Sequence, residues 1–576
     1  MPSPPFDRKA ALERLAAESF DVLVIGGGAT GCGVALDAAA RGLRTALVEA
    51  RDFAFGTSSK SSKLIHGGLR YLQQHDYLLV YEALHERQRL IRNAPHLVRP
   101  LPFLIPLFGR NGTIAKGVAK AYSVALWTYD LTGGLRIGHR HRRIDATGAL
   151  AHFPVLRTDR LVASFLYWDA QADDARLTLA LARTATREGA VVANYSPVDT
   201  LLEDGGRVCG VRLADGTRVR ACVVVNAGGV WSDQIASLTG GDPRTNVAPP
   251  VSLRPAKGIH LAIPAERLPC DYATVLVVPG DKRSIFVVPW AADEVSNPVG
   301  PGRYTYVGTT DTDYSGPLDE PRCTSEDVAY LLAAVNAWTT ANLTPADVTG
   351  TWAGLRPLIS DARSARTADL SRRHRVITSP NGLITVTGGK LTTYRRMAAD
   401  TVDAAKRQLV GQDRRPSRRD ANRIPGSPTR RLTLIGGDAW GQPGGGVANR
   451  AARMGLAGEV VAHLTGRYGS ETGEVLALCE ADPTLVEPLI EDLPYIKAEA
   501  IHAVRHEMAV TLSDVLGRRT RALILDLAAT SRAAPDVAAL IGAELGWDAE
   551  ERDRQVTQVR AEALAGMAAL AAPVSG

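Results

Sequence analysis

Residues 21–49 read DVLVIGGGATGCGVALDAAARGLRTALVE, and the order of residue types in this stretch decides the fold. Residues 22–25 form an uninterrupted apolar run, which is typical of a central parallel strand buried on both faces. Glycines follow at once in the pattern G-x-G-x-x-G, and residues 30–41 and 43–48 then predict a helix and a second strand. The stretch therefore predicts a β-α-β unit of an α/β fold.

The glycines of this pattern and the acid that closes the stretch indicate nucleotide binding. Gly26 permits a tight turn, Gly28 lets a phosphate approach the backbone, and Gly31 lets the helix pack closely on the strand. The free N–H groups at the helix start favour a pyrophosphate, and Glu49 can accept hydrogen bonds from a ribose. A glycine-rich turn of any α/β protein could share the glycines, but the register of strand, helix, strand and acid favours a dinucleotide site. This motif alone does not decide between FAD and NAD.

Length and composition exclude several classes of protein. At 576 residues the chain exceeds the usual size of one hydrophobic core, so several domains are expected. The formal net charge of +6 is modest for this length and does not imply a nucleic-acid partner. No apolar run is long enough to span a bilayer, and the N-terminal residues carry charges where a signal peptide needs an apolar core. A cytoplasmic location is therefore expected.

Cysteine and histidine spacing argues against a metal centre. The six cysteines include no C-x-x-C pair, which disfavours a zinc ribbon, a redox dithiol or a disulfide framework. His502 and His506 are four residues apart, but the order H-x-x-x-H-E leaves no glutamate between them to act as the general base of a metalloprotease. No metal is expected.

Residues 51–77, RDFAFGTSSKSSKLIHGGLRYLQQHDY, are an unusual run of small, polar and basic residues. A flexible linker could have this composition, but Leu64, Ile65 and Leu69 interleave with the polar groups and predict a packed segment. Within it, SSKLIHGGLRYL closely resembles the flavin-contacting segment of FAD-dependent sn-glycerol-3-phosphate dehydrogenases. Gln73 follows where that family commonly has glutamate.

Two later stretches extend this resemblance. A predicted hairpin at 207–225 runs into VVVNAGGVWSD, which resembles the second nucleotide-contacting strand of flavoproteins with two dinucleotide folds. The strand GLITVTGG then enters a helix at Gly388, Gly389 and Lys390, where the helix dipole can stabilise negative charge on a reduced flavin. The segments occur in the family's order along nearly the whole chain, including the helical C-terminal part.

The resemblance implies an α/β fold with three components. They are a two-dinucleotide-fold, Rossmann-like FAD-binding domain, an antiparallel β-rich substrate domain and a C-terminal helical domain. The expected division is 16–106, 166–244 and 350–408 for the FAD-binding domain, 107–165 for a basic segment and part of the substrate or cap domain, 245–349 for the substrate domain, 409–431 for a linker and 432–550 for the helical domain.

The resemblance also implies an activity. In that family FAD accepts hydride at N5 from C2 of sn-glycerol 3-phosphate, dihydroxyacetone phosphate is formed, and the electrons pass to a membrane quinone. Such an enzyme works as a peripheral protein on the inner face of the cytoplasmic membrane, and a homodimer is compatible with this function. Three alternatives stay open: a glycerol-3-phosphate oxidase that produces hydrogen peroxide, an amine or amino-acid oxidoreductase of the same fold, and an FAD-binding protein without this activity.

By resemblance, the substrate site takes residues from several segments. Arg356 and Arg372 would bind the phosphate through guanidinium forks, and Arg70 and Tyr71 would line the reacting end. His260 is the first choice for the base and His66 the second, with Lys257 and Lys390 as electrostatic support. The cofactor residues are expected to be Gly26, Gly28, Gly31, Glu49, Ser59, Lys63, His66, Gly67, Gly389, Lys390 and Thr392.

Positive charge is concentrated in residues 107–143. This segment holds one acid, Asp130, and seven basic residues, Arg110, Lys116, Lys120, Arg136, Arg140, Arg142 and Arg143. A predicted helix here has Lys116 and Lys120 beside Trp127 on the side opposite an apolar stripe of Val118, Tyr122, Ala125, Leu126 and Tyr129. Two interpretations stay open: the segment contacts an anionic membrane, or it is a solvated basic face packed on a domain.

Overall fold

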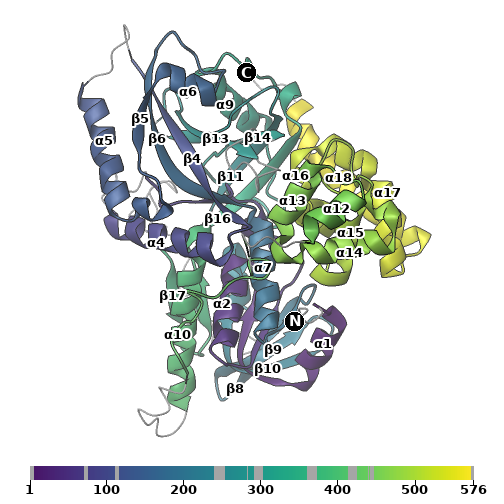
Figure 1. The fold of residues 1–576 in the computed structure, drawn as a ribbon. Helices are drawn as coiled ribbons and strands as arrows, with labels where there is room; N and C mark the ends of the chain where they lie inside the picture. Colours follow the sequence, from purple (N-terminus) through teal and green to yellow (C-terminus); the bar gives the residue numbers. More distant parts are fainter. Residues whose placement is uncertain are drawn as a thin grey trace.

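The computed structural model describes most of the chain (Figure 1): residues 6–69, 76–109, 116–238, 253–281, 283–290, 303–359, 373–412, 424–438, 440 and 446–571. Three residues predicted for the substrate site, Arg70, Tyr71 and Arg372, lie outside these ranges.

The first sheet is built around the predicted β-α-β unit. Its parallel strands follow the order β18 (Ile384–Thr387), β10 (Arg218–Asn226), β1 (Ser19–Ile25), β2 (Thr45–Val48) and β7 (Val191–Ala193). Antiparallel strands extend it, namely β17 (Arg375–Thr378) beside β18, and β9 (Arg207–Leu213) and β8 (Val198–Asp204) beyond β10. This strand arrangement confirms the Rossmann-like domain.

Both faces of this sheet are covered. Helices α2 (Ala29–Ala40), α7 (Asp174–Arg187) and α10 (Tyr394–Gln412) pack on one face, where Val22 and Val24 are fully buried. Helix α1 (Arg8–Ala17) and the β8–β9 hairpin cover Leu23 on the other face. The apolar run of β1 therefore lacks alternation because neither face meets water.

The second sheet is mainly antiparallel. Its main path contains β15 (Thr312–Asp313), β11 (Leu253–Pro264), β14 (Tyr304–Gly308), β13 (Ser284–Trp290), β12 (Ala273–Val277), β4 (Val98–Phe108), β6 (Leu161–Ala172) and β3 (Leu64–Ile65). Strand β16 (Gly350–Ile359) pairs with β11, and β5 (Arg142–Asp145) pairs with β6. Helices α6 (Ala146–His152) and α9 (Ser325–Asn336) lie on one face, and α4 (Tyr77–Asn93) and α5 (Lys116–Leu131) on the other.

The strand pairing differs from the expected domain division at four places, one of which is β3, assigned to the FAD-binding domain but paired with β6. Strand β16 was expected in the FAD-binding domain, but it forms a long antiparallel ladder with β11. Strand β4 and the end of β6 were also assigned to that domain, yet they pair with each other in the second sheet. The chain therefore crosses between the sheets more often than composition suggested, because sheet membership depends on partners that are distant in the sequence.

The C-terminal helices gather against one side of both sheet domains (Figure 1, green to yellow). Their bounds are α12 (Val447–Arg453), α13 (Gly458–Tyr468), α14 (Thr472–Ala481), α15 (Lys497–Glu507), α16 (Ala522–Leu525), α17 (Leu527–Leu545) and α18 (Ala549–Ala571). A π-helical turn, η10 (Asp514–Arg519), contacts α7 of the first domain, and α18 contacts β16. Helix α18 extends past the expected end of this domain at residue 550.

Helix α5 turns part of its predicted apolar stripe into the core. Leu126 and Tyr129 are buried, and the Tyr129 hydroxyl lies 2.6 Å from a carboxylate oxygen of Asp169 on β6. Of the two interpretations left open for this segment, packing on a domain therefore holds for Leu126 and Tyr129, which lie in the core beside the second sheet. Val124, Trp127 and Leu131 remain exposed on the opposite side of α5.

Candidate active site

The glycine turn after β1 has the close packing that its sequence predicts. Gly26 adopts a φ of +112°, and a Cβ there would lie 2.7 Å from the carbonyl oxygen of Ala227. A Cβ at Gly31 would lie 1.9 Å from the carbonyl oxygen of Gly26, so only glycine lets α2 approach the strand. Gly28 is the N-cap of α2, and its missing Cβ leaves the helix N-terminus open on the cavity side.

Glu49 lies at the end of β2 and bridges two backbone segments. Its carboxylate accepts hydrogen bonds from the N–H of Gly27 at 2.5 Å and the N–H of Arg51 at 2.9 Å. Burial raises the pKa of this carboxyl, while the two backbone donors act in the opposite direction. The side chain therefore ties the glycine turn to the segment that follows β2.

A cavity of about 480 Å³ extends from the glycine turn across the end of the first sheet. Gly26, Gly28 and Glu49 line one part of it, and Gly389 and Lys390 line another. The N-termini of two helices, α2 and the η7–α10 segment, thus contribute to one cavity. Its size, glycine cradle and paired helix ends fit an extended dinucleotide with a pyrophosphate and a redox-active ring.

A second cavity, of about 150 Å³, adjoins the first. It is lined by His66, His260, Arg356, Lys390 and Lys60, among others. The two cavities share a wall that consists of Thr57, Ser61, Pro357, Gly389, Lys390 and Leu391. The cationic second cavity therefore opens where the far end of the dinucleotide cavity ends.

Arg356 is held in this second cavity by the sheet itself. It sits on β16, and its guanidinium donates to Asp311 Oδ1 at 3.0 Å and to Thr309 Oγ1 at 3.1 Å. The Arg356 side chain is 19% exposed to solvent. The guanidinium is therefore held in a fixed position at the cavity wall, where its positive charge can attract an anion.

His260 is more deeply enclosed than a solvent-facing base would be. Its Nε2 lies 2.9 Å from Ser62 Oγ, and its ring stacks on Trp352 with centroids 4.8 Å apart. Burial lowers its pKa well below the ordinary value, and Lys63 and Arg356 lower it further. The lowered pKa keeps the imidazole neutral near physiological pH and also makes it a weaker proton acceptor than a solvent-facing histidine.

His66 and Thr392 both line the second cavity and contact each other. The His66 N–H lies 3.1 Å from the Thr392 hydroxyl oxygen, and that hydroxyl lies 3.3 Å from the His66 carbonyl oxygen. This contact fixes the segment after β3 against the N-terminal turn of the η7–α10 segment, next to Lys390. Both predicted bases, His66 and His260, line the second cavity.

Several predicted site residues do not line either cavity. Lys257 points to α9, where its ammonium lies 2.7 Å from Asp327. Lys63 is fully buried and donates to Asp174 at 2.9 Å, while Ser59 is buried beneath its own turn. The Gly67 N–H lies 3.0 Å from the Tyr129 hydroxyl oxygen. These residues contact other parts of the fold and line neither cavity, so they can support the site only indirectly.

Sequence reasoning missed Lys60 and Ser62. Both line the second cavity, and both belong to the SSKSSK run in which other members were selected. Burial, followed by the charge of Arg518, lowers the pKa of Lys60 to about 8. The repeated small residues of the run were a usable signal, because Ser58, Ser61 and Ser62 each line a cavity wall.

Within the described part of the chain, the structure holds no cluster of His, Cys, Asp and Glu suited to a metal ion. His502, predicted not to bind zinc, is buried with its Nδ1 3.7 Å from Glu507. No described helix combines the length and apolarity that crossing a bilayer requires.

The family comparisons agree with this geometry. Residues 21–395 match the family model of FAD-dependent oxidoreductases, and residues 427–552 match the C-terminal domain of alpha-glycerophosphate oxidase. The chain is thus an FAD-dependent oxidoreductase by fold and by the cavity that its glycine turn forms.

Relatives that match nearly the whole chain show which family of FAD-dependent oxidoreductases it belongs to. A glycerol-3-phosphate dehydrogenase of Mycobacterium leprae is 42% identical over 99% of this chain and 92% of its own length. A mitochondrial glycerol-3-phosphate dehydrogenase of Mus musculus is 38% identical over 94% of this chain and 73% of its own length. The crystal structure of a Bacillus halodurans glycerol-3-phosphate dehydrogenase complexed with FAD has 30% identity and a TM-score of 0.75, with 99% of each chain covered. The chain belongs to the FAD-dependent glycerol-3-phosphate dehydrogenase family.

Proposed function

We propose that the protein oxidises sn-glycerol 3-phosphate to dihydroxyacetone phosphate. The observation that carries this proposal is the shared wall between the two cavities at Gly389, Lys390 and Leu391. It places a small cationic cavity beside the end of the cofactor cavity, as a phosphorylated alcohol requires. FAD, when bound, supplies the acceptor for the hydride that leaves C2.

The chain's own residues divide the remaining work. Arg356 and Lys390 bring positive charge to the cavity and would bind the phosphate. His260 or His66 would accept the hydroxyl proton, because each lines the same cavity and carries an imidazole. The N-terminus of the η7–α10 segment would stabilise negative charge that develops at the cofactor's reactive ring.

Anaerobic substrate reduction tests this proposal. The purified protein, loaded with FAD, should lose its oxidised flavin absorbance on addition of sn-glycerol 3-phosphate and keep it on addition of glycerol. Bleaching by glycerol, or by neither compound, would contradict the role of a phosphate-binding cavity. Bleaching by amino acids or amines instead would favour the other oxidoreductases that share this fold.

A dehydrogenase and an oxidase differ in the compound that accepts electrons from the reduced flavin. We favour a quinone, as the family resemblance implies, over oxygen. The match of residues 427–552 to a domain of alpha-glycerophosphate oxidase keeps the oxidase as the second candidate. Stoichiometric hydrogen peroxide in air would support the oxidase, whereas slow oxygen turnover with fast reduction of a soluble quinone would support the dehydrogenase.

A surface formed by α4 and α5 supports an association with anionic membranes. It exposes the large apolar side chains Tyr77, Leu78, Tyr81, Val124, Trp127, Leu131 and Leu135. A groove of about 460 Å³ between the helices is lined by Tyr77, Lys120 and Val124. Arg136, Arg140, Arg142 and Arg143, close by in the chain, are exposed.

Exposed apolar and basic side chains in one region fit a lipid surface with anionic headgroups. Each basic residue near such a surface contributes about 1 kcal/mol of attraction. We therefore propose that this α4–α5 surface rests on the inner face of the cytoplasmic membrane, where a quinone is within reach.

A further inference from the structure

Residues 49–59, named here the flavin segment, form much of one wall of the cofactor cavity. Seven of these residues line it: Glu49, Ala50, Arg51, Phe55, Gly56, Thr57 and Ser58. The segment also touches the glycine turn, because the Ala54 N–H donates to the Gly27 carbonyl oxygen at 3.0 Å. Any shift of the flavin segment therefore changes the shape of the cofactor site.

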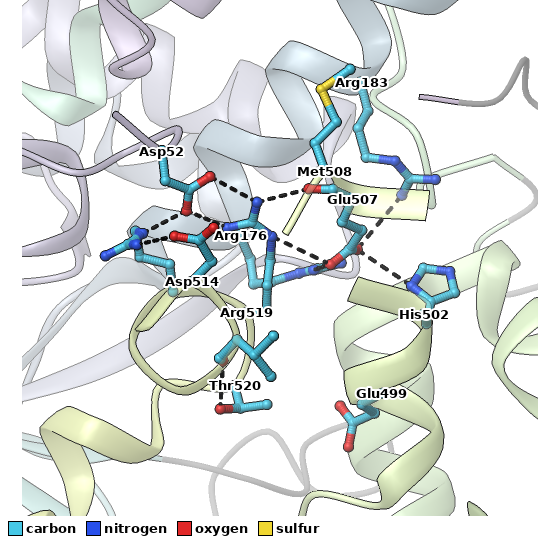
Figure 2. A network of polar contacts seen from close by, with 12 residues as sticks. Asp52, Arg176, Arg183, Glu499, His502, Glu507, Met508, Asp514, Arg519 and Thr520 are labelled. Carbon is cyan, nitrogen blue, oxygen red and sulfur yellow. Dashed lines mark hydrogen bonds and ion pairs between the residues drawn. The ribbon is translucent and has the colours of Figure 1, made fainter. Parts of the chain in front are cut away.

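Asp52, within this segment, points away from the cavity into a buried network (Figure 2). Its carboxylate is fully buried and receives both terminal nitrogens of Arg519, at 2.6 and 2.9 Å. Arg518 donates to the same carboxylate at 2.5 Å, and Asn194 donates at 3.2 Å. Both charged partners of Asp52 thus come from η10 of the C-terminal domain.

The buried negative charge of Asp52 makes its contact with Arg518 and Arg519 necessary for the structure of the flavin segment. Burial opposes ionisation of Asp52, but Arg519 and Arg518 outweigh burial and hold its pKa below the ordinary value. A buried carboxylate without these guanidinium groups would have to take up a proton or move toward water. Either response removes the ionic contacts that hold the backbone between Arg51 and Phe55 against η10.

The C-terminal domain also holds the far end of the segment. Arg521 donates to the Ser59 carbonyl oxygen and, at 3.2 Å, to Asp174. The Arg518 guanidinium lies 5.7 Å from the centroid of the Phe55 ring, which lines the cavity. Three arginines within four residues of the C-terminal domain therefore contact the flavin segment at its start, middle and end.

Arg519 is itself fixed by the rest of the network. Its guanidinium donates to the Glu507 carbonyl oxygen at 2.7 Å, and the Glu507 carboxylate accepts from Arg176 of α7 at 2.6 Å (Figure 2). Contacts from α7 and α15 together thus orient the guanidinium group of Arg519. The C-terminal domain is docked on the FAD-binding domain by the same contacts that hold Asp52.

We propose that the C-terminal helical domain is a positioning element for the cofactor, which acts through Arg518, Arg519 and Arg521 on the flavin segment. Docking of this domain and binding of FAD are coupled, so that each strengthens the other. The residues do not line the cavity, and their effect on the cofactor passes through Asp52 and Ser59.

Arg183 and Glu471 provide a matched control. They form a second buried bidentate pair between α7 and the C-terminal domain, with distances of 2.6 and 2.9 Å. Both side chains are buried, with 6% and 8% exposure against 2% and 0% for Arg519 and Asp52, and neither residue contacts the flavin segment. Arg183 also lies 3.8 Å from the Glu507 carboxylate, so lysine is the substitution of choice: it loses the fork to Glu471 and weakens domain docking, but it keeps a positive charge beside Glu507.

The test compares FAD affinity in Arg519→Lys, Asp52→Asn and Arg183→Lys. Lysine keeps the charge but loses the fork, so Arg519→Lys and Asp52→Asn should weaken FAD binding by about tenfold or more. Arg183→Lys should lower the melting temperature of the apoprotein by a similar amount and leave the FAD dissociation constant within about twofold. With FAD saturating, KM for sn-glycerol 3-phosphate should stay unchanged in all three.

Two results would overturn the proposal. One is an equal loss of FAD affinity in Arg183→Lys and Arg519→Lys. It would show that the network contributes to general stability and has no specific effect on FAD binding. The other is unchanged FAD affinity in Arg519→Lys and Asp52→Asn. If Asp52→Asn does not fold, Arg518→Gln replaces it, because Arg518 makes only one of the three guanidinium contacts to Asp52.

Discussion

The imidazole of His260 and the hydroxyl of Ser62 lie 2.9 Å apart in the second cavity. Ser62 follows the flavin segment, whereas His260 stands on β11 of the second sheet, so this contact joins the two halves of the site. The other ring nitrogen, Nδ1, is buried and makes no hydrogen bond to a described residue. The contact with Ser62 therefore determines how this ring is oriented toward a substrate.

His260→Ala should slow anaerobic flavin reduction by about 10²- to 10⁴-fold if His260 is the base. Because burial lowers the pKa of His260 well below its ordinary value, the reduction rate should show no inflection from this group near neutral pH. Stopped-flow reduction across pH measures both effects. A larger loss in His66→Gln than in His260→Ala would assign the proton to His66 instead.

Arg356→Lys should lower kcat/KM for sn-glycerol 3-phosphate by about 10- to 100-fold, the value of one or two hydrogen bonds to a charged group. The ammonium keeps the charge but cannot reproduce the fork that Asp311 and Thr309 hold in place. FAD content should not change. Arg254→Lys, an exposed residue of the neighbouring strand paired with Asp313, is the control and should leave kcat/KM intact.

Gly28→Ala and Gly31→Ala should fail in different ways. At Gly28 the nearest atom to an added Cβ is the Ser58 hydroxyl oxygen at 3.1 Å, so the apoprotein should fold but bind FAD weakly. At Gly31 an added Cβ would lie 1.9 Å from a backbone oxygen, and the apoprotein itself should be destabilised. Flavin absorbance per protein and thermal unfolding separate the two. A fully yellow Gly28→Ala protein with wild-type FAD affinity would refute this role of Gly28.

Glu507→Gln should reduce stability in a pH-dependent manner. Burial opposes ionisation of Glu507, but Arg176, His502 and Arg183 outweigh it and lower its pKa from the ordinary value of 4.5. Its contribution is therefore present above pH 4.5 and is lost as the pH falls below that value.

The variant should lose about 3–5 kcal/mol of unfolding free energy at neutral pH and show a shallower acid limb. Denaturant unfolding from pH 7 down to about pH 3 measures both. Glu480→Gln, which removes an exposed partner of Arg450, is the control and should change little. An acid limb as steep as that of the wild type would contradict the assignment.

Membrane binding should depend on both parts of the α4–α5 surface. Arg140→Gln, Arg142→Gln and Arg143→Gln together should remove the salt-sensitive part of binding to anionic vesicles, because each basic residue contributes about 1 kcal/mol. Trp127→Ala should weaken the salt-resistant part. Leu564→Ser, at an exposed apolar position of α18, is the control. Vesicle binding that is indifferent to all these changes and to salt would place the lipid contact on another surface.

The parts of the fold that could be predicted are those specified locally. The glycine turn, α2 and β2 appear where the sequence predicted them, because an apolar run, a glycine pattern and an acid in register leave few alternative structures. Likewise the β9–β10 hairpin and the helix after Lys390 follow from turn residues and periodicity.

The remaining features depend on partners far away in the sequence. Lys257 was expected at the substrate, but Asp327 at the start of α9 draws its ammonium away. Lys63 was expected at the flavin, but Asp174 of α7 holds it inside the scaffold. Nothing in the local pattern of either lysine distinguishes a ligand contact from a buried ion pair, since both need a positive charge. The pairing of β16 with β11 was missed for the same reason.

The distance along the chain between Asp52 and Arg519 affects how the enzyme is made. The two residues are 467 positions apart, so at ordinary translation rates the acid leaves the ribosome on the order of a minute before its arginine. During that interval the nascent flavoprotein has its glycine turn but lacks the groups that neutralise Asp52. We therefore expect the nascent chain to bind FAD more weakly until residue 519 has emerged, and a polypeptide released earlier to retain its cofactor less well.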